Sequence, residues 1–121
     1  MLGEKAGSAE ASRTTTGPPR LERRLRRETA IPARLDLHGC DRNDAVERLR
    51  GFLREVARRR PAPELVLVIH GKGARVLARA VRDVLDADPR VAEHVQAPRR
   101  LGGEGARVAR LRSPAQGSRR D

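Results

Sequence analysis

The chain has 121 residues, which is enough for one small domain with tails, and it is basic, with 27 Lys and Arg against 16 Asp and Glu. Residues 35–112 alone hold 17 basic and 11 acidic side chains, so a polyanion, above all nucleic acid, is the expected partner of the domain itself. Phe52 is the only aromatic residue, which disfavours a site that stacks bases on aromatic rings and favours phosphate contact with weak sequence preference.

The N-terminal segment divides into two parts. Residues 1–19 are small and polar with Gly and Pro, a composition typical of disorder. Residues 20–28 read RLERRLRRE and are compatible with a short basic helix that carries Leu21 and Leu25 on one face; the alternatives are a solvated charge run and an arm that grips nucleic acid or a ribosome. We therefore expect a disordered basic arm, one domain and a disordered tail, over residues 1–33, 34–112 and 113–121.

The sequence repeats a pattern that predicts one strand followed by one helix. Leu35–Gly39 (LDLHG) and Leu65–Gly73 (LVLVIHGKG) each contain an apolar run that ends in His-Gly, and a shift of 32 positions places His38 on His70. Two such units form a right-handed crossover with parallel strands, whose carboxyl ends share the edge where open sheets bind ligands. We expect one cleft at this edge to hold four polar side chains: Asp36, His38, His70 and Lys72.

Helical patterns follow both His-Gly corners. The first helix is predicted to begin near Asp41, a favourable N-cap, and to end in Arg58–Arg60. The second begins near Ala74 and ends at Asp88, which precedes a proline. Two short strands on either side of a Gly-rich loop complete the pattern, at residues 91–96 and 106–111.

Three motifs now stand in order: LDLHG, an apolar strand ending in HGKG, and GGEGARV before a terminal strand. Together they resemble the Smr domain, the small MutS-related domain, over residues 35–112. The resemblance implies an α/β fold, a two-layer β-α-β-α-β-β arrangement with two helices against a four-stranded mixed sheet. That fold is similar to the C-terminal domain of translation initiation factor three.

The resemblance also implies a function. Smr domains are associated with nicking of DNA and with endonucleolytic cleavage of RNA, including messages on stalled ribosomes, and some members only bind. By position, the family's functional residues correspond to five positions of this chain: Asp36, His38, His70, Lys72 and Gly73.

The chain departs from the family pattern at two places. The family commonly has Thr or Ser and then Gly after HGKG, where this chain has Ala74 and Arg75, so a capping hydroxyl is lost and a cation gained. It often has Thr after GGxGA, where this chain has Arg107. Because of these changes, the resemblance does not define the substrate or the backbone geometry at the start of the second helix.

Cleavage of a phosphodiester needs a base, an acid and stabilisation of phosphate charge. Histidine suits both proton roles because its ordinary pKa is about 6.5. Asp36 and His38 are two residues apart, so on a strand they face the same side; Asp36 would orient the imidazole or bind a metal with it, and a buried loop cap is the alternative. Lys72 is one of only two lysines, which favours a compact charge against phosphate, with chance as the alternative. His94 is interpreted as a surface residue of an edge strand.

Glycines let the backbone approach a ligand, and the amides at a helix start can hold an anion. For the glycines of the third motif, a hairpin turn is the alternative to phosphate contact. We assign phosphate binding to the glycines and cations of the motifs: Gly39, Gly71, Gly73, Arg75, Gly102, Gly103, Gly105 and Arg107.

The leading hypothesis is an endonuclease that cleaves RNA or nicks DNA with low sequence specificity. His38 is the base, Asp36 orients it, His70 assists or acts as the acid, and Lys72 stabilises the phosphate. RNA cleavage through the 2′-OH needs no cofactor; a divalent cation at Asp36 is the alternative. A non-catalytic RNA-, DNA- or ribosome-binding module is the second hypothesis, and a small-molecule anion site is the third.

The chain's surroundings are also constrained. The lone Cys40 excludes an internal disulfide and fits a reducing compartment. No apolar run is long enough to span a membrane. We expect a cytoplasmic monomer with no membrane partner, and an organellar transit peptide is the alternative.

Overall fold

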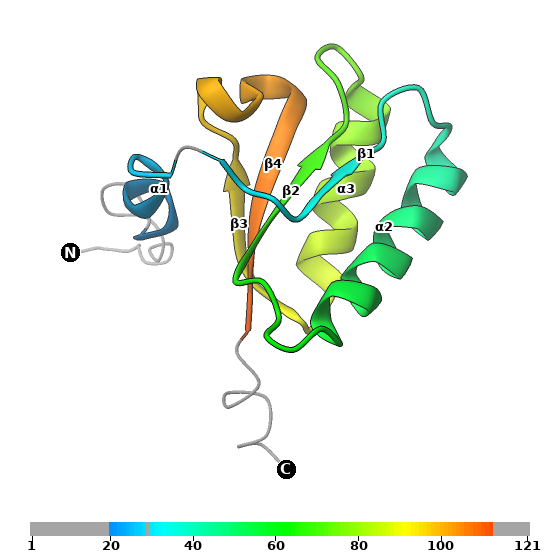
Figure 1. The fold of residues 1–121 in the computed structure, drawn as a ribbon. Coiled ribbons are helices and arrows are strands. Elements are labelled where there is room, and N and C mark those ends of the chain that lie inside the picture. The colour runs from blue at the N-terminus through cyan, green and yellow to red at the C-terminus, as the bar shows by residue number, and fades with distance from the viewer. Residues whose placement is uncertain (1–19, 29, 113–121) are drawn as a thin grey trace, which may run out of the picture.

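The structure is a computed structural model that describes residues 20–28 and 30–112. Its elements follow the order α1 (Arg20–Leu25), β1 (Arg34–Asp36), α2 (Arg42–Ala57), β2 (Leu65–Ile69), α3 (Arg75–Ala87), β3 (Val91–Gln96) and β4 (Ala106–Leu111). Two 3₁₀ turns, Arg99–Leu101 and Gly103–Gly105, connect β3 to β4. The predicted β-α-β-α-β-β arrangement is confirmed, with one further helix before it (Figure 1).

The four strands form one mixed sheet in the order β1-β2-β4-β3. β1 and β2 are parallel, as the repeated strand–helix pattern predicts, and β4 pairs antiparallel with both β2 and β3. β2 lies inside the sheet and is apolar throughout, which is typical of a strand covered on both faces.

Helices α2 and α3 cover one face of the sheet (Figure 1). α2 begins where the sequence predicts, because the Asp41 carboxylate caps it by accepting the Asp44 N–H at 2.8 Å. The core of this layer is built from apolar residues of both helices, the inner strands and the corner after β1, among them Leu37, Leu49, Leu53, Val66, Val68, Val81, Leu85 and Ala109.

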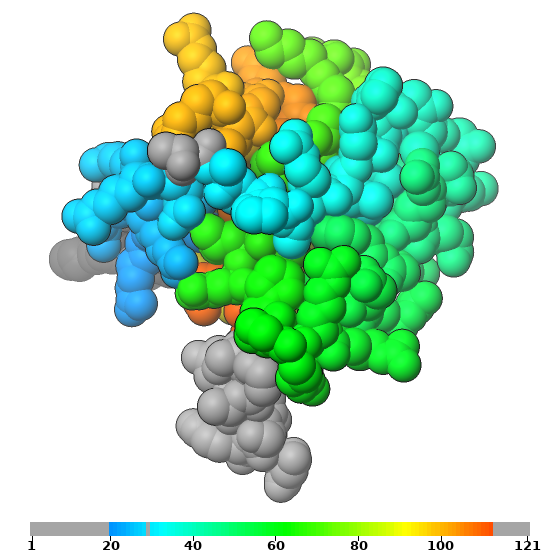
Figure 2. Space-filling view, viewed as in Figure 1, coloured from blue at the N-terminus to red at the C-terminus, as the bar shows by residue number. Residues whose placement is uncertain are grey.

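The opposite face is covered by α1, which differs from the expected disordered arm. Leu21 and Leu25 are each 1% exposed. Figure 2 shows the segment that contains them packed on the surface of the domain. The physical reason is that two helices cover only one face of β2 and β4, so apolar side chains on the other face need a second cover. The core there comprises Leu21, Leu25, Ile31, Leu65, Leu67, Val95 and Val108.

Polar contacts fix α1 in place. Arg24 forms an ion pair with Glu64 at 2.6 Å, and the Arg100 guanidinium donates to the backbone carbonyls of Leu25 and Glu28. The expectations for residues 1–19 and 113–121 lie outside the described residues. None of the helices in the described ranges has the length and apolar character that crossing a membrane requires.

Candidate active site

The two His-Gly corners meet at one edge of the sheet. Asp36 pairs with Ile69, and the Leu37 N–H donates to the Ile69 carbonyl at 2.7 Å, so the parallel pairing continues past the end of β1. A Cβ on Gly71 would lie 3.7 Å from the Cβ of His38. Residues far apart in the sequence are therefore neighbours here, at the upper edge in Figure 1.

The third motif joins the same edge through Gly105. Its carbonyl accepts both the His70 N–H at 2.8 Å and the Gly71 N–H at 2.9 Å. A Cβ on Gly105 would lie 2.9 Å from the backbone nitrogen of Lys72, closer than real Cβ atoms come. The HGKG loop is therefore fixed directly against the backbone before β4, and only glycine fits.

His38 and Asp36 form an exposed pair. His38 Nδ1 lies 2.7 Å from Asp36 Oδ1, and the same oxygen accepts the His38 backbone N–H at 3.0 Å. The hydrogen bond from the imidazole is the main cause that lowers the pKa of Asp36, followed by the bond from the backbone amide. Because a carboxylate only accepts, Nδ1 carries the proton and Nε2 keeps a free lone pair. The Asp36 side chain is 52% exposed, which argues against a buried loop cap.

His70 occupies a different environment. It is only 4% exposed, and its Nδ1 lies 3.2 Å from the Gly71 carbonyl oxygen. Burial is the main cause that lowers the pKa of its imidazole, and the nearby charges of Arg107 and Arg82 lower it further. His70 is therefore neutral at neutral pH.

The sheet register explains the difference between the two histidines. The motifs align with a shift of 32, but the strands pair Asp36 with Ile69, a shift of 33. His70 therefore continues Val68 on the side of α2 and α3, whereas Asp36 and Ile69 share the other side. Within the described residues no hydrogen bond joins the two imidazoles. The backbones of the two corners meet, while His70 faces the helix layer and Asp36 faces the other side of the sheet.

Lys72 stands exposed between Gly71 and Gly73, whose φ values of 100° and 80° form the turn. Within the described part of the chain, Lys72 and Arg75 have no hydrogen-bonded or ion-paired side-chain partner. Ala74 occupies the N-cap of α3 and makes no side-chain cap bond. The edge therefore combines two uncommitted cations with a helix start that no side chain caps.

The glycines of the third motif serve mainly as a turn. The amides of Gly102, Gly103 and Gly105 donate to the carbonyls of Arg99, Pro98 and Gly102, at 3.2, 3.0 and 3.0 Å. These bonds support the turn interpretation, because the amides are already used within the loop. Gly39 lies exposed in the turn directly after His38.

Arg107 lies on β4, partly buried on the side of α3. Its Nε donates to His94 Nδ1 at 2.6 Å, and His94 Nε2 lies 2.6 Å from Asp86 Oδ1 on α3. The expectation that His94 is a surface residue is wrong: its side chain is 10% exposed, because α3 covers the inner side of the edge strand. The signal in the sequence was Arg107 itself, a charge that alternates onto the same side of β4 as the apolar Ala109 and Leu111.

In the described ranges, no three His, Cys, Asp or Glu side chains are grouped closely enough to hold an ion. Cys40 accepts a hydrogen bond from Arg48 Nη1 at 3.1 Å and packs against the core.

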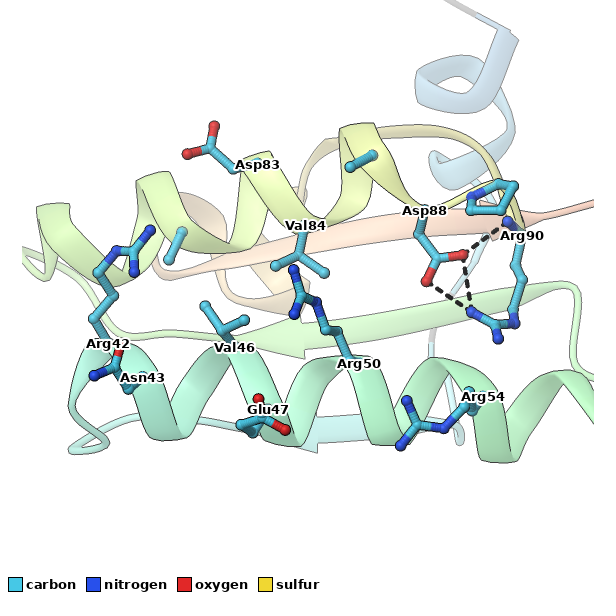
Figure 3. Close-up of a pocket in the computed structure, with 13 residues that line it drawn as sticks. Arg42, Asn43, Val46, Glu47, Arg50, Arg54, Asp83, Val84, Asp88 and Arg90 are labelled. Carbon is cyan, nitrogen blue, oxygen red and sulfur yellow. Dashed lines mark hydrogen bonds and ion pairs between the residues drawn. The ribbon is translucent and has the colours of Figure 1, made fainter.

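A groove of about 620 Å³ separates α2 from α3 on the outer side of the helix layer (Figure 3). Val46 and Val84 point into it, and an Asp88–Arg90 ion pair of 3.0 Å closes one end. Arg42, Arg50 and Arg54 line its α2 side, and no described residue pairs with them. The groove does not include the motif residues, and the sequence patterns did not indicate it.

Comparison with known proteins agrees with these motifs. Residues 35–112 match the Smr domain family. The chain is 36% identical over 78 residues to Endonuclease MutS2 of Helicobacter pylori, which covers 64% of this chain and 10% of that protein. It is 37% identical over 109 residues to an uncharacterized protein of Treponema pallidum, which covers 85% of this chain and 52% of that protein. The chain thus spans about a tenth of the MutS2 relative and half of the second.

Solved structures show the same architecture. The Smr domain of Thermus thermophilus MutS2 superposes with a TM-score of 0.61 at 32% identity, covering 66% of this chain and 98% of that one. YdaL, a stand-alone small MutS-related protein from Escherichia coli, superposes with a TM-score of 0.65 at 23% identity, covering 73% of this chain and 70% of that one. The second likeness concerns the fold alone.

Proposed function

Since the chain belongs to the Smr domain family, we propose that it is an endonuclease that cleaves RNA or nicks DNA with low sequence specificity. The exposed Asp36–His38 pair carries this proposal, because it presents a free imidazole nitrogen where three motifs meet. The MutS2 relative is named an endonuclease, and it matches over the Smr region.

In the proposed reaction, His38 Nε2 removes the proton of the attacking hydroxyl, which is the 2′-OH of RNA or a water molecule for DNA. Asp36 holds the ring in the required tautomer and stabilises the imidazolium that forms. Lys72 lies beside the same corner and neutralises charge on the phosphate oxygens. The proton for the leaving oxygen can come from water, because this edge is open to solvent.

The sequence left two roles for His70: it assists His38, or it acts as the general acid. Its 4% exposure favours the assisting role. Its backbone N–H is bonded to Gly105 and its ring lies beside the Gly71 carbonyl, so it supports the HGKG loop from behind. We assign proton transfer to His38 and support of the loop to His70.

The test uses end-labelled RNA and DNA of one sequence, wild type and His38→Ala, with and without a chelator. The expected result is RNA cleavage that survives the chelator, fails when deoxyribose stands at the cut site, and falls roughly 10²- to 10⁴-fold in the variant. Loss of wild-type activity with chelator would instead assign Asp36 to a metal. Intact substrate under all conditions would refute the nuclease assignment.

A binding module is the second candidate, for structured RNA, branched DNA or a ribosome. The observation that favours it is the burial of His70, which leaves one exposed imidazole at the edge. Equal binding by wild type and His38→Ala, together with uncut substrate, would establish this alternative. Under either proposal we place the chain in the cytoplasm as a monomer.

A further inference from the structure

A second polar cluster lies behind the HGKG loop, within the layer between α3 and the sheet. Arg107 on β4 pairs with Val68, two residues before His70, which places it about 7 Å inside the motif edge. His94 on β3 and Asp86 on α3 complete a chain of two hydrogen bonds, each 2.6 Å long. The family resemblance assigns no role to His94 or Asp86.

The hydrogen bonds define the state of each group. An arginine Nε always donates, so His94 Nδ1 is the acceptor and carries no proton. The imidazole proton is therefore on Nε2, from which it is donated to Asp86. Arg107 is held through Nε alone, and its two terminal nitrogens have no bonded partner among the described residues.

Arg82 brings a second guanidinium to the same place. It lies one helical turn before Asp86 on α3, so both side chains point the same way. Burial is the main cause that lowers the pKa of both Arg107 and His70, and the charge of Arg82 lowers each further. Asp86 is the carboxylate nearby, and it is already bonded to His94. Two cations with open donors thus lie near enough to act on each other's charge, an arrangement that an anion would stabilise.

We propose that Arg107 and Arg82 bind a phosphate of the substrate strand beside His70, and that His94 and Asp86 are positioning residues that hold the Arg107 guanidinium for it. The inference rests on the proposed function for its ligand, a nucleic acid strand. It assigns the contact to a phosphate other than the one attacked at His38, because Arg107 and His38 lie on opposite sides of the sheet.

The test measures anisotropy of a fluorescent 2′-O-methyl RNA strand, which lacks the attacking hydroxyl, across a series of salt concentrations. Arg107→Gln and Arg82→Gln should each weaken binding roughly tenfold and reduce the slope of log affinity against log salt by about 0.7. Arg58→Gln is the matched control, since it removes the same charge at the far end of α2 and should leave the slope unchanged.

The positioning role is tested with two variants of His94. His94→Leu should weaken binding about as much as Arg107→Gln, while His94→Asn, which keeps an acceptor near the Nδ1 position, should restore most of it. Nitrogen NMR of the wild type should show Nδ1 unprotonated and Nε2 protonated at neutral pH. Arg82 is exposed, so Arg82→Gln reports on phosphate binding even where a His94 variant unfolds.

The outcomes are distinct. Wild-type binding with unchanged slopes in Arg107→Gln and Arg82→Gln overturns this inference and leaves the proposed function standing. Wild type that binds neither this strand nor matched DNA overturns the proposed function together with the phosphate site. A His94 ring protonated on Nδ1 overturns the positioning role.

Discussion

At the scale of single residues, the candidate chemistry depends on one shared oxygen. Asp36 Oδ1 accepts both from the His38 ring at 2.7 Å and from its backbone amide at 3.0 Å. The two bonds fix the ring relative to its own backbone, so an exposed imidazole keeps one orientation. This compensates for the lack of packing around a side chain that is 73% exposed.

Asp36→Asn tests that orientation. The amide can present NH₂ to Nδ1, which favours the tautomer with its proton on Nε2 and removes the free lone pair. We expect cleavage to fall by roughly 10²- to 10⁴-fold with little loss of binding, by analogy with the aspartate of a catalytic triad. Unchanged turnover in single-turnover assays would show that Asp36 does not act through His38.

His70 and His94 predict how stability depends on pH. Burial lowers the pKa of both in the folded chain, so below about pH 6.5 the unfolded chain binds protons that the folded chain does not. Stability should therefore be highest above pH 6.5 and fall as pH decreases through that value. The pKa of Asp36 is also lowered, and its protonation affects stability only in the more acidic range below about pH 4.

Melting temperatures between pH 8 and pH 5 measure this effect, and the His38→Ala chain is the matched control because His38 is exposed. His70→Asn should flatten the dependence and His38→Ala should not. A flat profile in the wild type would contradict the burial of His70.

At the scale of elements, α1 shows where sequence patterns lose information. Its two leucines are buried, yet seven of the nine residues in RLERRLRRE are charged, and composition alone points to solvent. The need for this helix arises from the uncovered face of β2 and β4, a property of the assembled sheet. No sequence pattern around Leu21 indicates that this face of the sheet needs a cover.

Leu21→Ala should therefore destabilise the domain by about 2–5 kcal/mol, the usual cost of truncating a buried leucine. Urea unfolding measures it, with Glu22→Ala on the exposed side of α1 as the control, expected within about 0.5 kcal/mol of wild type. Equal effects of the two changes would mean that α1 does not pack on the sheet in solution.

The parts that the sequence did predict are those with local causes. Asp41 caps α2, Pro61 and Pro89 follow the helices, and β2 is a continuous apolar run. The corners were also predicted to meet, because parallel strands place their ends together. The side of the sheet that His70 faces was not predicted, because the shift that aligns the motifs differs by one residue from the shift that pairs the strands. Register is set by pairing across the sheet and is invisible in either motif alone.

Gly105→Ala tests the contact that joins the third motif to the HGKG loop. The added Cβ would stand 2.9 Å from the Lys72 nitrogen, so this loop must shift. We expect lower activity together with a loss of stability of about 1–3 kcal/mol. Gly51→Ala is the matched control, because it lies in α2 with only the end of Arg54 nearby at 3.7 Å, and it should stabilise the chain by about 0.5–1 kcal/mol.

At the scale of the whole molecule, the positive charge is spread over more than one surface. The motif edge carries Lys72 and Arg75, and the groove between α2 and α3 carries three arginines without described partners (Figure 3). A field of this kind attracts a polyanion from a distance and raises the association rate more than it stabilises the final contact. Substitutions can therefore test the charges that guide association separately from the residues proposed for chemistry.

The triple variant Arg42→Gln, Arg50→Gln and Arg54→Gln separates them. At low salt kcat/KM should fall about tenfold or more, because steered association is lost, while kcat at saturating substrate should change less than about twofold. At high salt the variant and wild type should converge, since screening removes steering from both. The control is Lys72→Gln, for which kcat should fall at every salt concentration because the proposed phosphate contact acts in the transition state. A triple variant whose kcat falls with kcat/KM would place the groove in direct contact with the substrate near the scissile bond.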